Sequence, residues 1–348
     1  MGRERAGGGV QIDLLPSKEK SVAFRAIRRV EPRMPHPENL SIEHNRRSLI
    51  RDGEHKVIKR CQAAVGGLLC QSRRLLINWF MQDGDPRIQS QSDGMDPARA
   101  AAFQAALGQA QTVNAGSALP PFFHQLYFWQ ALPPKRLGRD GHPDVGGLIP
   151  DMGLPRRMWA GGELRFHRPL RAGIVATRNS RCVAQSRKQG RSGPLGFVTI
   201  NHTIWQNESL CLSEDQNIVY RNDLEPGELA STPPIAPTGE EETHEAVFDT
   251  TLMFRYSALT FNGHRIHYDQ DYSREVEGYT GLVVHGPLLA QKLMLLAEAS
   301  MGPLSTFNYR ATSPLMHHET GFLCRKGSDL WVRGPDGRQC MIAAATTH

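Results

Sequence analysis

The sequence predicts an α+β protein of two similar halves, in each of which a long helix precedes several antiparallel strands. Residues 285–300 are apolar at helical spacing, and residues 121–132 form an aromatic, apolar stretch of helical length. Strand-like runs follow both segments, and the sequence GRSG at 190–193 separates two of these runs as a hairpin turn would. A helix wrapped by a curved antiparallel sheet buries both the helix and one sheet face, so two such halves would form a pseudo-dimer.

The first 75 residues differ in charge from the rest of the chain. The 348 residues carry a net charge of +6, and residues 1–75 hold 16 lysines and arginines against 8 acidic residues. Weak periodicity and three closely spaced prolines (Pro32, Pro35 and Pro37) predict a basic, disordered extension over 1–75. A nucleic-acid-binding arm would carry stronger charge clustering, so nucleic acid is the less favoured partner.

The first folded half is predicted over residues 76–223. Its first helix is expected at 96–109, where Asp96 suits the N-cap and Pro97 the first helical position. The aromatic stretch Pro121–Leu132 predicts a buried helix, and the glycine- and proline-rich residues 133–161 predict a long loop. Strands are expected at Glu163–His167, Ile174–Gln185, Leu195–Gln206 and Gln216–Tyr220.

Residues 224–245 have the proline- and glutamate-rich composition of a linker, and the second half is predicted over 246–348. A long strand at Ala246–Thr260 is expected first, then a polar segment and the helix at 285–300. The apolar face of that helix contains Leu288, Leu289, Met294, Leu295 and Leu296. The remaining strands are expected at Ser305–Ala311, Ser328–Val332 and Gln339–Thr346.

Two segments of this half, RYSALTFNGHRIHYD (255–269) and GLVVHGPLLAQKLM (281–294), carry the candidate chemistry. Asn262 and His267 lie five residues apart after the predicted strand, and Gly286 begins the predicted helix. An imidazole can take up and return a proton near neutral pH, and a free N–H at a helix start can stabilise a developing negative charge. Asn262 can orient water but cannot carry charge. The set predicts addition of water to, or its removal from, an activated carbon–carbon double bond.

The second half resembles the MaoC-like or hydratase-2 branch of the hot-dog fold, whose motif is Y-S-x(n)-G-D-x-N-P-[LIV]-H followed by HG at a helix start. Two positions depart from this motif: Asn262 replaces the catalytic aspartate, and His264-Arg265 replaces Asn-Pro. The altered motif is similar to that of mesaconyl-C4-CoA hydratase, itaconyl-CoA hydratase and type 2 hydroxyacyl-thioester dehydratases, as are LPRRMWAGGELRFHRPLRAG (154–173) and GRSGPLGFVTINH (190–202). The matching motif residues are Tyr256, Ser257, Asn262, Ile266, His267, His285 and Gly286.

The resemblance covers about residues 76–346 and implies a double hot-dog fold. It also implies a hydro-lyase that adds water to a 2-enoyl-CoA or dehydrates the 3-hydroxyacyl thioester, with a short dicarboxylic acyl-CoA such as mesaconyl-C4-CoA or itaconyl-CoA as substrate. His267 is then the catalytic base, the amide of Gly286 binds the thioester carbonyl, and Asn262 positions water.

Guanidinium groups bind phosphates and carboxylates through paired hydrogen bonds, so Arg255 and Arg265, with His285, are the predicted substrate-binding residues. His264, His267 and His285 lack a carboxylate or cysteine to complete a metal-ligand set, so no metal is expected. No Walker A loop, GxGxxG after a strand or GxSxG elbow occurs in the sequence, and no cofactor is expected.

Two other functions stay open from the sequence. A hot-dog thioesterase would need a carboxylate near the helix, for which only Glu275 and Glu277 lie nearby, and Asn262 keeps a non-catalytic acyl-thioester-binding protein open. The cysteines form no CxxC pair. No apolar run reaches the roughly 20 residues of a membrane span, and nothing resembles a signal peptide. We expect a cytoplasmic protein, with a homodimer as the quaternary state to test.

Overall fold

The structure is a computed structural model that describes residues 88–190, 193–223 and 232–348. The predicted basic extension, residues 76–87 of the predicted first half, and residues 224–231 of the predicted linker lie outside the described residues. The described residues all belong to one compact unit.

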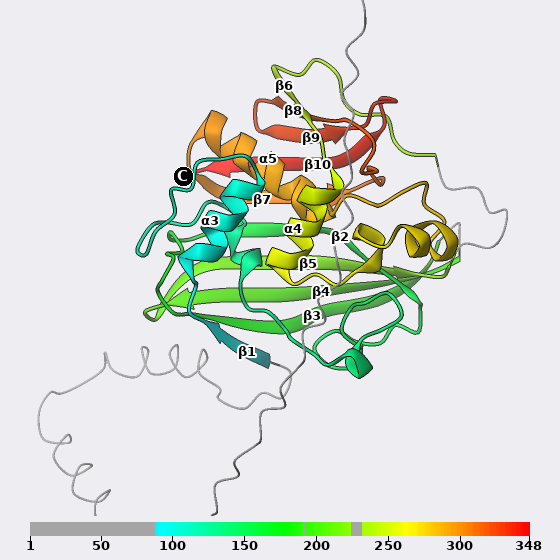
Figure 1. Cartoon of the computed structure of the whole chain (residues 1–348), viewed down its shortest axis with the longest axis horizontal. Coiled ribbons are helices and arrows are strands. Elements are labelled where there is room, and N and C mark those ends of the chain that lie inside the picture. Colours follow the sequence, from blue (N-terminus) through cyan, green and yellow to red (C-terminus); the bar gives the residue numbers. More distant parts are fainter. Residues whose placement is uncertain (1–87, 191–192, 224–231) are drawn as a thin grey trace, which may run out of the picture. The chain divides into compact units, whose positions relative to one another are not determined.

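A single antiparallel sheet of ten strands organises the described chain (Figure 1). Each half contributes five strands. From the outer edge of the sheet inward, both halves place their first, third, fourth, fifth and second strand in that order, and the halves join where β2 pairs with β7. This repeated order confirms the predicted α+β, double hot-dog architecture. The first half runs β1 (Ile88–Asp93), β3 (Ala176–Gly190), β4 (Gly193–Gln206), β5 (Ser209–Arg221) and β2 (Arg156–Phe166). The second half runs, from the other edge, β6 (Glu242–Ala246), β8 (Gly321–Lys326), β9 (Asp329–Arg333), β10 (Gln339–Thr347) and β7 (Leu304–Ala311).

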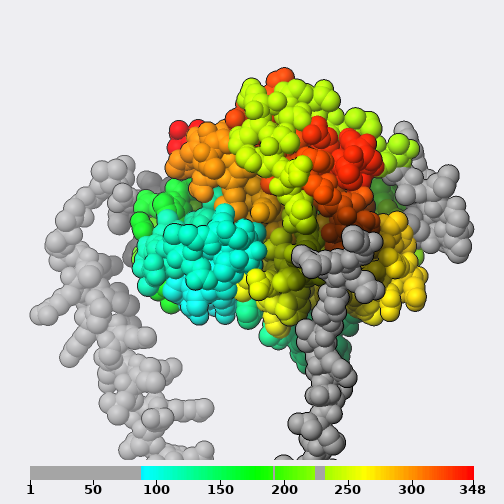
Figure 2. Space-filling model, turned by 45° about the horizontal axis from the view of Figure 1, so that its top comes forward, coloured from blue at the N-terminus to red at the C-terminus, as the bar shows by residue number. Residues whose placement is uncertain are grey.

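Three helices lie against one face of this sheet: α3 (Pro97–Ala106), α4 (Thr250–Thr260) and α5 (Gly286–Met301) (Figure 1). The predicted cap of α3 is confirmed, because Asp96 Oδ1 accepts a hydrogen bond from Ala98 N at 2.9 Å. The predicted helix at 285–300 is also confirmed as α5, which buries Leu288, Leu289 and Leu293 against the sheet. In the space-filling view, the lime segment 232–246 lies between the orange α5 and the red C-terminal strands (Figure 2).

The expected strand over Ala246–Thr260 was wrong, because β6 ends at Ala246 and α4 follows it. Asp249 caps this helix by accepting a hydrogen bond from Leu252 N at 2.7 Å. The buried residues Met253, Tyr256 and Ser257 have helical spacing. The threonines and aromatic residues of this segment favour a strand locally, and burial of this one face outweighs that preference.

The helix predicted over Pro121–Leu132 was also wrong. Only Phe123–Leu126 forms a short 3₁₀ turn, and Phe122 and Phe128 adopt positive φ angles of 68° and 61°. Phe122, Phe123, Tyr127 and Phe128 are buried in the core, as expected, although no single helix carries them. The irregular backbone also lets His124 and Gln125 reach Glu214 of β5.

The other strand predictions were confirmed with shifted ends. β2 begins at Arg156, so the predicted loop at 133–161 is shorter than expected. Three short strands were not predicted: β1, β8, and β6, of which residues 242–245 belong to the predicted linker. β1 and β6 are edge strands and mostly polar, so their sequences lack the apolar alternation that marks a half-buried strand.

None of the helices in the described residues is long and apolar enough to span a membrane. The four described cysteines are free thiols (Cys182, Cys211, Cys324 and Cys340), and Cys61 and Cys70 lie outside the described residues. The cytoplasmic location and the homodimer stay predictions.

Candidate active site

His267 is held by the backbone that leads into α5. Val283 N donates a hydrogen bond to Ile266 O at 3.0 Å, which places the polar segment beside the start of the helix. His267 Nδ1 lies 2.7 Å from Val283 O. A carbonyl oxygen can only accept, so Nδ1 carries the proton and Nε2 keeps its lone pair. His267 therefore has the tautomer that a general base requires.

Burial lowers the pKa of His267 to about 3, against the opposing effect of the Val283 carbonyl. The ring stacks on His285, with centroids 3.7 Å apart, and meets His264 edge-on at 5.3 Å. Burial also lowers the pKa of both neighbours. All three imidazoles are thus neutral near pH 7, and a proton taken by His267 would place positive charge in a crowded, poorly solvated cluster.

Gly286 is the first residue of α5 and lines the same cavity as His267. Within the described residues no acceptor for its N–H is found, as is usual for the first N–H groups of a helix. Its position at the helix N-terminus makes this N–H a donor for a negatively charged oxygen.

Replacing Gly286 with alanine is expected to lower the hydration rate roughly 10- to 100-fold, because a displacement of about 1 Å can cost about 100-fold. An added Cβ would find Trp159 O, 3.8 Å away, as its nearest neighbour, so the fold has room for it. The unfolding temperature should therefore stay within about 2 °C of the wild type. Turnover and thermal unfolding measured on the same sample test this. Unchanged turnover would show that the substrate does not approach this amide.

Asn262 follows α4 and also lines the cavity. Its N–H donates to Ser257 O at 2.8 Å, and its Oδ1 accepts a hydrogen bond from His264 N at 3.0 Å. One lone pair of the side-chain oxygen is therefore engaged, while the other lone pair and the Nδ2 group can contact water or substrate.

A loop of the first half closes one side of the site. Arg265 N donates to Asp140 O at 2.9 Å, and Gly141 packs directly on Gly263. A Cβ on Gly141, whose φ is +85°, would lie 2.0 Å from Gly263 O, so this contact requires glycine. The loop carries His142 into the cavity lining, where its ring lies 4.3 Å from that of His264.

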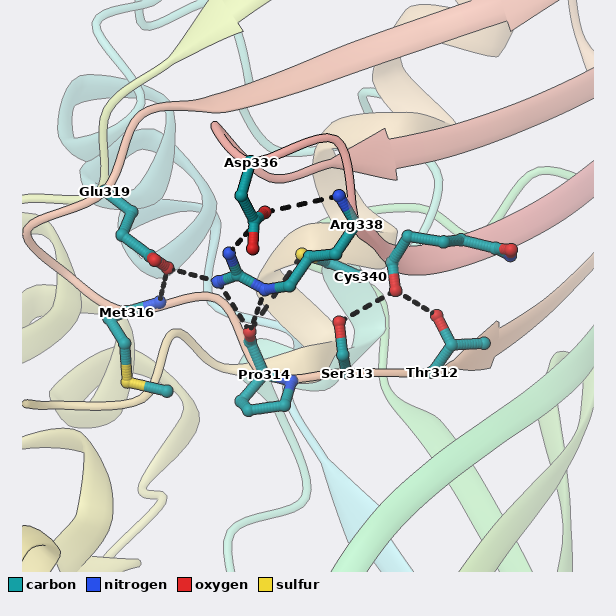
Figure 3. A network of polar contacts seen from close by, with 9 residues as sticks. Thr312, Ser313, Pro314, Met316, Glu319, Asp336, Arg338 and Cys340 are labelled. Atoms are coloured by element: carbon teal, nitrogen blue, oxygen red, sulfur yellow. Dashed lines mark hydrogen bonds and ion pairs between the residues drawn. The ribbon is translucent and has the colours of Figure 1, made fainter. Parts of the chain in front are cut away.

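The cavity has a volume of about 1770 Å³, larger than the roughly 300–1,000 Å³ of most small-molecule sites. Arg338 braces another part of its wall (Figure 3). Its guanidinium pairs with Glu319, donates to Asp336 Oδ1 at 2.8 Å and donates to Pro314 O at 3.0 Å. Glu319 in turn accepts a hydrogen bond from Met316 N at 2.8 Å. Arg338 therefore holds the loop 312–319 at two points, Pro314 and Glu319.

The structure does not bring the predicted substrate-binding arginines to the cavity. Arg255 lies on the exposed side of α4, outside the lining. Arg265 points away as well: it pairs with Asp269 at 2.7 Å and lies over the ring of Tyr272. His285 is fully buried behind His267, where its Nε2 lies 2.8 Å from Ser257 Oγ. His285 therefore supports the ring of His267 instead of contacting substrate.

Sequence reasoning missed three residues that the fold gathers here, Asp140, His142 and Arg157, and gave no role to a fourth, His264. Arg157 lines the cavity, where it donates to Pro143 O at 3.2 Å. Burial is the main cause that lowers the pKa of His142 and His264, and the charge of Arg157 adds to it. Three of the four lie more than 100 residues before His267, and only the DGH sequence at 140–142, inside the predicted loop, hinted at a polar site.

Asp140, His142 and His264 offer one carboxylate and two imidazoles whose donor atoms lie within 4.8 Å of one another. A divalent cation at their centre would have to separate Asp140 from His142, because His142 Nδ1 already bonds to Asp140 Oδ2 at 2.9 Å. We therefore assign no metal to these residues.

Comparison with known proteins agrees with this geometry. The family described as hydroxyacyl-thioester dehydratase type 2 matches residues 122–317. The chain is 44% identical over 235 residues to the mesaconyl-C(4)-CoA hydratase of Chloroflexus aurantiacus, which covers 66% of this chain and 84% of that protein. It is 28% identical over 246 residues to the mitochondrial hydroxyacyl-thioester dehydratase type 2 of Schizosaccharomyces pombe, which covers 62% of this chain and 81% of that protein.

Solved structures share the fold. HtdX of Mycobacterium tuberculosis matches with a TM-score of 0.53 at 17% identity over 75% of this chain and 100% of its own. A MaoC-like dehydratase of Phytophthora capsici matches with a TM-score of 0.55 at 11% identity over 76% of this chain and 97% of its own. At these identities the likeness concerns the fold alone. The family match, which spans more than half of the chain, and the 44% identical relative show that the chain belongs to the hydroxyacyl-thioester dehydratase type 2 family and is a hydro-lyase.

Proposed function

We propose that this hydro-lyase reversibly hydrates a short dicarboxylic 2-enoyl-CoA, such as mesaconyl-C4-CoA or itaconyl-CoA, at the cavity between His267 and Gly286. The observation that carries the proposal is the pairing of a neutral His267, with Nε2 unprotonated, and a helix-start N–H on the walls of one cavity. A base for water and a donor for the thioester oxygen are the two functions that hydration of an enoyl thioester requires.

The reaction at this site follows from these two groups. His267 Nε2 takes a proton from water while the water oxygen bonds to the β-carbon of the substrate. The π electrons of the double bond move toward the thioester oxygen, where the Gly286 N–H stabilises the negative charge; one such donor can be worth about 3 kcal/mol. The imidazolium then gives its proton to the α-carbon, which forms the C–H bond and restores neutral His267. The reverse sequence dehydrates the 3-hydroxyacyl thioester.

The second carboxylate of a dicarboxylic substrate needs a cation, and Arg157 is the candidate. Three arginines of the cavity lining are already paired with acidic residues: Arg136 with Asp144, Arg156 with Glu277, and Arg338 with Glu319. The other two arginines of the lining, Arg157 and Arg221, form no ion pair with another described residue. Of these two, Arg157 is the one whose charge adds to the effect of burial in lowering the pKa of His142 and His264. A guanidinium binds a carboxylate through two parallel hydrogen bonds.

Replacing Arg157 with methionine is therefore expected to raise the KM for mesaconyl-C4-CoA about 10-fold or more, because a charged hydrogen bond is worth about 1.5–3 kcal/mol. The KM for crotonyl-CoA, which has no second carboxylate, should change little. The exposed Arg255→Met provides the matched control and should leave both constants unchanged. An equal rise in KM for both substrates would contradict the role of Arg157 in binding the carboxylate, but it would not contradict the hydratase reaction.

The reaction itself is tested with the full chain by following the loss of enoyl-thioester absorbance and, in parallel, the release of free CoA. Hydration predicts loss of absorbance without CoA release. Release of stoichiometric CoA would indicate a thioesterase. Tight binding of enoyl-CoA without either signal would indicate the non-catalytic binding protein.

A further inference from the structure

The site lacks the negative charge that its chemistry calls for. The cluster of His264, His267 and His285 becomes positively charged when His267 takes a proton. Asn262 cannot balance that charge, because its side chain is neutral. The carboxylates of the cavity lining are all neutralised by arginines, since Asp144 pairs with Arg136, Glu277 with Arg156 and Glu319 with Arg338. The compensating charge therefore has to come from outside the lining.

Asp140 is the carboxylate that meets this need. Its side chain is 12% exposed, and its ion-pair partner among the described residues is a histidine, His142, rather than an arginine. Asp140 Oδ1 accepts from His142 N at 3.0 Å, and Oδ2 lies 2.9 Å from His142 Nδ1. A carboxylate oxygen of Asp140 and one imidazole nitrogen each of His142 and His264 lie within 4.8 Å of one another.

We propose that Asp140, acting through His142, supplies from the loop of the first half the negative charge that Asn262 cannot carry. This inference rests on the proposed hydratase function. Asp140 is a positioning residue: it holds the proton of His142 on Nδ1, because a carboxylate can only accept. Its charge stabilises the imidazolium that forms while the proton passes from water to His267 and on to the α-carbon, and no atom of Asp140 enters a bond that forms or breaks.

Three features support this role. Burial alone would raise the pKa of Asp140, but the hydrogen bonds from His142 and the charge interactions with His142 and His264 hold it below its usual value, so the group is ionised. The Gly141–Gly263 contact and the bond from Arg265 N to Asp140 O fix the loop against the catalytic segment. The positive charge of Arg157 also acts on His142 and His264, so the two imidazoles next to Asp140 lie in a positive field that a carboxylate offsets.

The test replaces Asp140 with asparagine and compares it with Asp151→Asn in the same loop. Both aspartates accept a hydrogen bond from the backbone N–H two residues later, from His142 N and from Gly153 N, but Asp151 is exposed and lies outside the cavity lining. At position 140 the amide can still accept from His142 N, while its NH₂ group faces His142 Nδ1 and shifts the proton of that ring to Nε2.

With crotonyl-CoA and mesaconyl-C4-CoA as probes, Asp140→Asn is expected to lower kcat about tenfold or more, which corresponds to about 1.4 kcal/mol. KM should stay within about twofold, because the substrate does not touch the carboxylate. Asp151→Asn should match the wild type. The double variant Asp140→Asn/Asn262→Asp should recover most of the lost kcat, because it returns a negative charge to the position where the MaoC-like motif has an aspartate.

The proposal is overturned if Asp140→Asn has the same kcat per folded molecule as Asp151→Asn. It is also overturned if the substitution changes KM and leaves kcat unchanged. It is also overturned if the double variant stays as slow as the single one, or if chelation abolishes wild-type activity and zinc restores it, which would make these residues metal ligands. In each of these cases the wild type still hydrates enoyl-CoA, whereas a wild type without hydration would refute the proposed function itself. Unfolding temperatures of all variants identify a merely structural loss.

Discussion

Replacing His267 with alanine is expected to lower the rate of enoyl-CoA hydration at least about 100-fold, the lower end of what a general acid–base group contributes. His267 Nε2 is the unprotonated imidazole nitrogen left free by the bond from Nδ1 to Val283 O. Asn262 and Gly286 can orient water and stabilise the thioester oxygen, but neither can accept a proton from water near neutral pH. The measurement is kcat/KM with mesaconyl-C4-CoA and crotonyl-CoA.

A second substitution separates catalysis from packing. His267→Gln keeps an N–H that can donate to Val283 O and fills much of the same space, yet it has no basic nitrogen. It should therefore be as inactive as His267→Ala while unfolding at nearly the wild-type temperature. The exposed His167→Gln is the matched control and should be fully active. Full activity in His267→Ala would end the assignment of this residue as the base.

The second large expected effect is a loss of stability in mild acid. His202, His264, His267 and His285 are buried, and burial is the main cause that lowers the pKa of each, to about 3 for His267. In the unfolded chain each has a pKa of about 6.5. Below that pH these histidines bind protons in the unfolded state but stay neutral in the folded state. The free energy of unfolding therefore falls as the pH falls. Above pH 6.5 this contribution to stability is fully present.

The size of the effect follows from linkage. Each neutral buried histidine lowers the free energy of unfolding by up to about 1.4 kcal/mol per pH unit below pH 6.5. Four of them acting together would remove about 5 kcal/mol per unit, comparable with the whole stability of a typical domain. Urea unfolding at pH 7.5, 6.5 and 5.5 measures the slope.

One variant and one control make this measurement specific. His202 lies in the first half, bonded to Ser180 Oγ at 2.7 Å and Gln216 Oε1 at 3.1 Å. His202→Gln should reduce the pH slope by about a quarter, because one of four titrating sites is gone. His167→Gln should leave the slope unchanged, because its side chain is exposed. A stability that is flat between pH 7.5 and 5.5 would show that the buried rings accept protons without unfolding.

Local signals predicted some elements well and others badly. The helix at 285–300 has a glycine and a proline at its start and an apolar face of several leucines, so its prediction needed no distant contact. The segment 246–260 mixes threonines and aromatic residues that are compatible with a strand, and its only clear helix signal is the N-cap Asp249. Residues 121–132 are apolar because the core surrounds them, and apolar content alone does not distinguish a buried helix from a buried irregular segment.

The predicted site was limited in a similar way. His267, Asn262 and Gly286 lie within 25 residues of one another, and the structure places all three around one cavity. The arginines chosen from the same stretch point elsewhere: Arg265 toward Asp269 and Arg255 toward solvent. A charged residue near a motif in the sequence can face any direction, because the side of α4 or of the following turn that it occupies depends on packing.

The sequence by itself was enough to predict the fold class, the family and the grouping of His267, Asn262 and Gly286 around one cavity, because each depends on side chains close together in the chain. Only the tertiary structure decided which charged and polar residues of the first half come close to the site of these three residues. Asp140, His142 and Arg157 reach it because β2 pairs with β7 and because Gly141 and Gly263 touch without side chains between them. Both contacts join residues that are more than 100 positions apart in the sequence, and no local sequence pattern predicts such contacts.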